Sequence, residues 1–245
     1  MKEISLEAVA EKYNDLDIIW HVKDKWHMHT KAMIDTFIAK TLKNRNLEDW
    51  KILNAGSAGY SYGLDERNII HIDIAAKRLN KLANSLVADV QNIPLPGEQF
   101  DLIICVGSVI NYCDPLLVIK EFSRLLKSAG KLILEFENSF TLELLGKRSF
   151  NQKAVVIDSF YNGQPEKVWF FSERYILELA SLYNLRQSDY SRCHILSPFA
   201  YRLFKSERFA ARLGKLDVFC RHVPFLRKFS SNTICLFSNI SNADS

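Results

Sequence analysis

The chain has 245 residues, of which 48% are hydrophobic and 24% charged. This ordinary globular composition excludes collagen-like, disordered and coiled-coil proteins, and the length suits one large α/β domain or two small ones. The net charge of +4 is too small to require a nucleic-acid partner. Five scattered cysteines, none in a C-x-x-C pair, predict reduced thiols and no structural zinc site. With no signal-peptide pattern and no apolar run of membrane-spanning length, we expect a cytoplasmic protein.

The first element predicted is an amphipathic helix over residues 18–42. Apolar side chains recur there three or four positions apart, which is the helical period. His21, His27 and His29 belong to this segment, but their spacing does not put all three on one helical face. No cysteine or carboxylate clusters with them in the sequence, so we expect no metal site.

Strands and helices alternate from residue 50 to residue 137. Apolar segments indicate buried strands, and Asp114 followed by Pro115 is typical of a helix start, with Gly130 as the stop. This alternation predicts a doubly wound, mostly parallel α/β sheet. The predicted strands are 51–55, 69–73, 86–88, 101–106 and 131–136, and the predicted helices are 75–83 and 114–127.

The remainder of the chain completes this domain. Ser172 is expected to cap a helix over 173–183, a strand should end before His194, and 233–237 is predicted as the last strand. We therefore divide the chain into an N-terminal helical cap or lid, 1–47, and a main domain, 48–245. Within the main domain, 192–231 is expected to be a basic, helical insertion on the substrate side.

Polar or small residues stand at the ends of three successive predicted strands. Gly56 follows the first, Asp73 ends the second and Asp89 follows the third. In a doubly wound sheet, ligands bind beyond the carboxyl ends of the strands. Gly56 lets the backbone approach a ligand, Asp73 can accept both hydroxyls of a ribose, and Asp89 can accept from a purine amine.

The ordered set resembles the class I S-adenosylmethionine-dependent methyltransferases, specifically the bacterial group acting on small molecules and glycans. The resemblance rests on Leu53-Asn-Ala-Gly-Ser-Ala58, the two aspartates, and Pro94 to Asp101 before an apolar strand. It implies a Rossmann-like, seven-stranded sheet ending in an antiparallel hairpin. It also implies S-adenosyl-L-methionine as cofactor, with these binding residues: Asn54, Gly56 and Ser57 at the methionine end, Asp73 and Ile74 at the ribose, Asp89 and Val90 at the adenine, and Val106 and Gly107 beside the sulfonium.

Three positions depart from the family's pattern. Ala58 and Tyr60 replace loop glycines, and Asn54 stands where an acidic residue is more frequent. A second hypothesis is therefore a non-catalytic binding protein that keeps the fold. The first remains favoured, because the methyl group of Ala58 is small and Gly59 beside it can adjust.

The acceptor is expected to be a small molecule or a glycan-like or lipid-linked compound, with O-methylation favoured over N-methylation. Ser108, Asn111 and Tyr112 are candidates for contacts near the fourth strand, and His194 is a remote candidate for a general base. His71, inside a strand, is expected to be a core residue. No catalytic residue is assigned.

A basic segment, 201–230, holds eight Lys or Arg residues against two acidic ones, interleaved with phenylalanines. The interpretation favoured is a cap over the substrate side with solvated cations. Peripheral contact with a membrane is the first alternative, and an RNA methyltransferase, resting on this segment alone, is the less favoured one.

Overall fold

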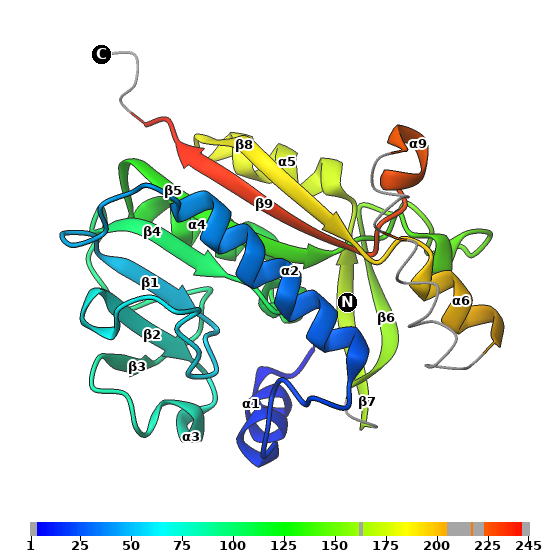
Figure 1. Cartoon of the computed structure of the whole chain (residues 1–245), viewed down its shortest axis with the longest axis horizontal. Helices are drawn as coiled ribbons and strands as arrows, with labels where there is room; N and C mark the ends of the chain where they lie inside the picture. Colours follow the sequence, from blue (N-terminus) through cyan, green and yellow to red (C-terminus); the bar gives the residue numbers. More distant parts are fainter. Residues whose placement is uncertain (1–3, 162–163, 205–216, 218–222, 242–245) are drawn as a thin grey trace.

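A seven-stranded sheet forms the centre of the computed structural model, which describes residues 4–161, 164–204, 217 and 223–241 (Figure 1). The strand order across the sheet is β3-β2-β1-β4-β5-β9-β8, with β9 antiparallel to both of its neighbours and the first five strands parallel. The expected mostly parallel sheet with an antiparallel end is confirmed. In order across the sheet, the strands are β3 (Ser85–Val87), β2 (Ile69–Asp73), β1 (Ile52–Ala55), β4 (Phe100–Cys105), β5 (Leu126–Glu137), β9 (Asn232–Asn239) and β8 (Leu185–Cys193).

Helices cover both faces of this sheet, which is why its inner strands are mostly apolar. Leu102 and Ile104 of β4 pack with α2 (Lys25–Leu42), which crosses the near face in Figure 1. Ile103 of β4 belongs to the other core cluster, together with residues of α4 (Pro115–Leu125) and α5 (Glu173–Leu182). Strands buried on both sides read as continuous apolar runs rather than as alternating patterns.

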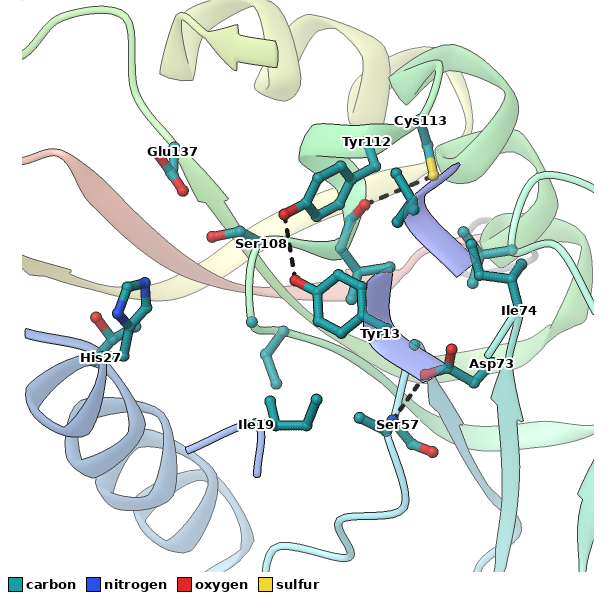
Figure 2. Close-up of a pocket in the computed structure, with 18 of the residues that line it drawn as sticks. Tyr13, Ile19, His27, Ser57, Asp73, Ile74, Ser108, Tyr112, Cys113 and Glu137 are labelled. Atoms are coloured by element: carbon teal, nitrogen blue, oxygen red, sulfur yellow. Dashed lines mark hydrogen bonds between the residues drawn. The ribbon is translucent and has the colours of Figure 1, made fainter. Parts of the chain in front are cut away.

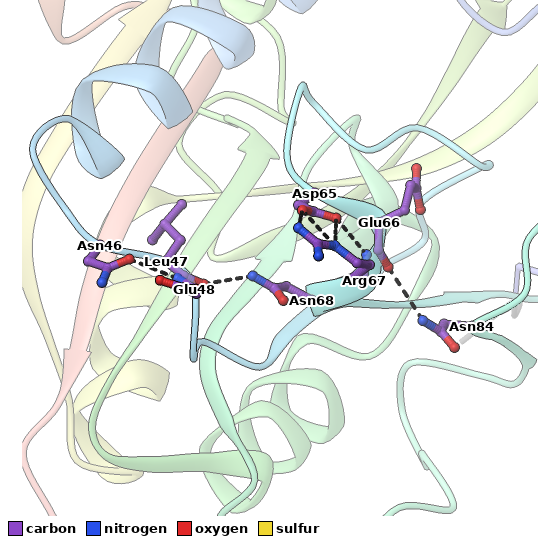
Figure 3. Close-up of polar contacts among 8 residues, drawn as sticks. All are labelled: Asn46, Leu47, Glu48, Asp65, Glu66, Arg67, Asn68 and Asn84. Atoms are coloured by element: carbon purple, nitrogen blue, oxygen red, sulfur yellow. Dashed lines mark hydrogen bonds and ion pairs between the residues drawn. The ribbon is translucent and has the colours of Figure 1, made fainter.

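Polar contacts tie together the loops that precede β1, β2 and β3 (Figure 3). The Asn68 side chain donates to the Leu47 carbonyl at 2.7 Å, and the Asn84 side chain donates to the Glu66 carbonyl at 3.4 Å. The 3-10 turn η1 (Glu66–Asn68) thus links the amino ends of three neighbouring strands. Their carboxyl ends, at the opposite edge of the sheet, are left to form the site.

The predicted N-terminal helix is wrong at its beginning. The structure has two helices, α1 (Leu6–Asp15) and α2, which begins at Lys25. Asp24 caps α2 by accepting from the His27 backbone N–H at 3.0 Å. Ile18 and Val22, which the periodicity assigned to a buried face, are 52% and 77% exposed in the connecting segment. The assignment of residues 1–47 as a lid stays a prediction.

The helix predicted to stop at Gly130 ends earlier, at Leu125, and the next residue already begins β5. The register of the β4–β5 pair shifts between Phe100 and Leu102. A Cβ atom at Gly130 would lie 2.8 Å from the Lys127 carbonyl oxygen and 3.0 Å from that of Phe100. This glycine therefore permits a close approach of backbone inside a strand instead of ending a helix.

Two further elements differ from the prediction. The helix expected over 75–83 is a single turn, α3 (Ala76–Leu79). The structure also has a separate two-stranded sheet, β6 (Ala154–Tyr161) and β7 (Gln164–Phe171), which was not predicted. Between β8 and β9 lie α6 (Ser197–Phe204) and α9 (Pro224–Arg227), while 205–216 and 218–222 of the predicted basic insertion lie outside the described residues.

Two leucines of α4 allow a matched test of the core. Leu125 is fully buried and Leu117 is 44% exposed on the same helix. We expect Leu125→Ala to lower the free energy of unfolding by about 2–5 kcal/mol, because it leaves a cavity, and Leu117→Ala by less than about 1 kcal/mol. Urea unfolding measures both, and equal losses would contradict this packing.

Candidate active site

One cavity lies at the carboxyl ends of the strands, and it encloses about 1080 Å³ with its open mouth included (Figure 2). It lies where β1 and β4 are neighbours in the sheet, the point at which strand order reverses. Nine positions were predicted from the sequence to contact a cofactor. All of them except Asn54 line this one cavity, namely Gly56, Ser57, Asp73, Ile74, Asp89, Val90, Val106 and Gly107.

The loop after β1 requires glycine at position 56. Gly56 has φ +68°, and a Cβ atom there would collide with both methyl groups of Val109. The amides of Gly56 and Ser57 both donate to the Ile72 carbonyl, at 2.7 and 3.1 Å. Asn54 is buried beneath the loop, where its side chain donates to the Tyr60 carbonyl instead of reaching the cavity.

Asp73 joins the end of β2 to the loop after β1. One carboxylate oxygen accepts from the Ala58 N–H and the other from the Ala75 N–H, each at 2.8 Å. Burial raises the pKa of Asp73, and these two amide donors offset part of that rise. A carboxylate has about four lone-pair sites, so acceptor capacity remains on both oxygens.

Hydrogen bonds from Gln91 hold the carboxylate of Asp89. Gln91 donates to Asp89 through its backbone N–H at 2.9 Å and through its side-chain amide at 2.9 Å. The Gln91 side-chain oxygen in turn accepts from the Asp114 N–H at 2.8 Å. The loop after β3 is thus fastened to the start of α4, which fixes where Asp89 stands along the cavity wall.

The N-terminal helices supply the wall that faces the sheet. Trp20 lies against Gly107, 3.6 Å from where a Cβ atom would stand, and its ring meets Tyr60 edge-on. Aromatic and aliphatic groups of α1, α2 and the segment between them complete this wall. They are Leu6, Val9, Tyr13, Ile19, Trp20 and Trp26.

A polar cluster closes the far end, where α1 meets β7. Tyr112 donates to Glu166 at 2.6 Å, and its hydroxyl lies 3.2 Å from that of Tyr13. Lys12 of α1 forms an ion pair with the same Glu166 oxygen at 2.5 Å. Burial and its acidic and phenolic neighbours raise the pKa of Tyr112, so this hydroxyl stays protonated as a donor.

Two glutamates of β5 stand beside this cluster. Glu135 is fully buried and accepts from the Ser108 N–H at 2.5 Å and from the Asn232 side chain at 2.7 Å. Glu137 lines the cavity, and burial together with the charges of Glu135, Glu143 and Glu166 raises its pKa well above the usual value. Figure 2 shows Glu137, Ser108 and His27 around one side of the cavity.

His27 pairs with a carboxylate, contrary to our expectation that none clusters with these histidines. Its Nδ1 lies 2.5 Å from Asp24, three residues earlier on the same turn. Burial alone would raise the pKa of Asp24, but the hydrogen bonds and charge of His27 offset this and lower it overall. His27 also lines the cavity. Among the described residues, no group of three potential metal ligands occurs.

The other predicted polar residues are structural. Asn111 is fully buried, donating to the Trp169 carbonyl at 2.5 Å and accepting from the Glu137 N–H at 3.2 Å. His194 is stacked on Trp26 with ring centroids 3.8 Å apart, and it lies outside the cavity lining. His71 is fully buried in β2, as expected.

Sequence reasoning missed Tyr13 and Glu166, and it did not assign Glu137 or His27 to the cavity. Glu137 carried a usable signal, because it directly follows the predicted strand 131–136 and strand ends converge at this edge. Glu166 carried none, because the hairpin that presents it was not predicted. Tyr13 and His27 reach the site only through the packing of α1 and α2 against the sheet edge.

Comparison with known proteins identifies the domain. Residues 54–134 match the family described as "Methyltransferase domain". This segment, about a third of the chain, is similar to methyltransferase domains. The fold is similar to that of geranyl diphosphate C-methyltransferase from Streptomyces coelicolor A3(2), with TM-score 0.57, 13% identity, and 95% of this chain and 97% of that chain covered. The resemblance found in the sequence is confirmed at the level of the fold.

Two curated relatives match parts of this chain. An uncharacterized protein of Methanocaldococcus jannaschii is 30% identical over 147 residues, 58% of this chain and 64% of the relative. Demethylmenaquinone methyltransferase of a Geobacillus species is 32% identical over 91 residues, 35% of this chain and 39% of the relative. The matches therefore span less than two thirds of either relative. Within the described ranges, no helix is both long and apolar enough to cross a membrane.

Two ion pairs provide a test of the polar cluster. Lys12–Glu166 is mostly buried, with side chains 16% and 12% exposed, whereas those of Lys40–Asp189 are 66% and 37% exposed. We expect Lys12→Met to destabilise the protein by about 1–3 kcal/mol, because it leaves the Glu166 charge without its cation. Lys40→Met should cost under about 1 kcal/mol. Urea unfolding compares them, and faster amide exchange in α1 should accompany only the first.

Proposed function

We propose that this chain transfers the methyl group of S-adenosylmethionine to a hydroxyl group of a small-molecule acceptor. The observation that carries the proposal is the convergence of Gly56, Asp73 and Asp89, from three strand ends, on one cavity. A glycan-like or lipid-linked small acceptor falls within this class.

The residues present fit the cofactor. Asp73 keeps acceptor capacity beyond its two amide donors and is proposed to bind the ribose hydroxyls. Asp89 and the buried Val90 are proposed to hold the adenine, Asp89 by accepting from its amine. Gly56 and Gly107 let the backbone pass close to the methionine portion.

The main role of the protein in this reaction is to position the acceptor and the cofactor relative to each other. The sulfonium of the cofactor supplies an activated methyl group. The side chains of Trp20, Trp26 and Tyr13 form walls that exclude water and hold the acceptor in line. Removal of the acceptor proton requires a base, since a neutral hydroxyl is a weak nucleophile.

We assign that base to His27. The ring lines the cavity and its Nδ1 lies 2.5 Å from Asp24. A carboxylate on one ring nitrogen orients the imidazole and stabilises the charge that it gains on taking a proton at the other nitrogen. This pair is the reason we favour a hydroxyl over an amine acceptor.

The alternative of a non-catalytic binding protein is less well supported. That alternative requires the loop after β1 to block the cavity, whereas Tyr60 of this loop borders a separate depression with Lys31 and Asp35. Ala58 adopts φ +46° and donates its N–H to Asp73, so the departure from glycine is accommodated. The RNA methyltransferase alternative draws on the basic segment, most of which lies outside the described residues.

Isothermal titration with S-adenosylhomocysteine tests the cofactor site. We expect binding by the unchanged protein and about 10- to 100-fold weaker binding by Asp73→Asn, because a charged acceptor for the sugar is lost. Asp65→Asn is the matched control, since Asp65 is exposed in the loop preceding β2 and lies outside the cavity lining. No heat with the unchanged, folded protein would overturn the proposal.

Variants of His27 test the hydroxyl chemistry. Radiolabelled S-adenosylmethionine and a panel of small alcohols, phenols and amines identify a working acceptor. With a hydroxyl acceptor, His27→Gln should lower kcat about 10²- to 10⁴-fold, with cofactor affinity unchanged. His29→Gln is the control, because His29 lies outside the cavity lining. Transfer to amines alone would contradict the assignment.

A further inference from the structure

A stack of phenylalanines joins the loop after β5 to α9, at the end of the molecule where Figure 1 shows α6 and α9. Phe140 is stacked on Phe229 with ring centroids 4.7 Å apart, and it lies 5.0 Å from Phe150. Phe229 meets Phe225 edge-on at 5.4 Å. Segments about 80 residues apart thus form one continuous piece of surface.

The outer end of this stack is apolar and exposed. Phe225 is 69% exposed, Val223 is 45% exposed and Leu145 is 44% exposed. Single exposed apolar residues are ordinary, but a group of large ones around one stack marks a site of interaction. The buried Phe229 packs against the Phe225 ring, and this contact holds Phe225 at the surface.

Cations flank members of this group along the chain: Lys228 follows Phe225 by three residues, and Lys147 and Arg148 precede Phe150, whose N–H donates to the Lys147 carbonyl at 3.1 Å. Lys147, Arg148 and Lys228 are all exposed, and none forms an ion pair with a described residue. We call the combined set the Phe225 surface. It consists of Leu145, Lys147, Arg148, Val223, Phe225 and Lys228.

We propose that the Phe225 surface docks on an anionic lipid bilayer. Exposed apolar side chains together with exposed Lys and Arg match the two layers of such a membrane, with the apolar groups entering the headgroup–acyl boundary and the cations meeting lipid phosphates. A nucleic acid would occupy the cations but would leave the aliphatic Val223 and Leu145 without a role. The proposal does not depend on the cofactor or on the methyl acceptor.

Vesicle sedimentation with the full chain tests it. The probes are vesicles of phosphatidylcholine alone and of phosphatidylcholine with about a third phosphatidylglycerol. We expect binding to the anionic vesicles, loss of most of it in high salt, and little binding to the neutral ones. Phe225→Ser should weaken binding about tenfold or more, because a phenylalanine no longer enters the bilayer. The pair Lys147→Ala and Arg148→Ala should weaken it about 25-fold, at about fivefold for each charge.

Leu182→Ser is the matched control, since Leu182 is 71% exposed at the end of α5 and does not belong to the Phe225 surface. It should bind as the unchanged protein does, and thermal melts should show all variants folded. The proposal is overturned if the unchanged chain ignores anionic vesicles, or if Phe225→Ser and Leu182→Ser behave alike. Two results together would assign the surface to nucleic acid instead. Single-stranded RNA would displace the unchanged protein from the vesicles, and it would bind Phe225→Ser as tightly as it binds the unchanged protein.

Discussion

The carboxylate of Asp73 is the contact on which the site depends. By accepting one amide from the loop after β1 and one from the start of the next helix, it fixes two strand ends relative to each other. A loop of small residues has little side-chain packing of its own, so hydrogen bonds must hold its shape. The same carboxylate borders the cavity, and structural support and ligand recognition therefore share one group.

The sequence predicted the part of the site that follows from local order. Gly56, Asp73 and Asp89 each stand at the end of a strand, and parallel strands bring such ends to one edge whatever the rest of the chain does. Asn54 shows the limit of this reasoning. It also lies near a strand end, but its side chain points beneath the loop, because a strand sends successive side chains to opposite faces.

The acceptor side of the cavity could not be predicted in the same way. Tyr13, His27 and Glu166 come from three elements whose positions are set by long-range packing, and the hairpin that carries Glu166 was unseen in the sequence. The early end of α4 has a similar cause. Pairing of Leu126 with Phe100 begins β5 directly after the helix, and this tertiary contact overrides the glycine stop signal. Local patterns therefore described the cofactor side better than the acceptor side.

The hydrogen bond between Thr30 and His194, 2.8 Å long, joins residues that are 164 positions apart. The cavity wall made by α2 thus packs against the far end of β8, and Asn232 of β9 also borders the cavity. Chains emerge from the ribosome N-terminus first. The face of α2 that meets His194 therefore stays uncovered until a segment 164 residues further along the chain has been synthesised, and the pocket can be completed only after that.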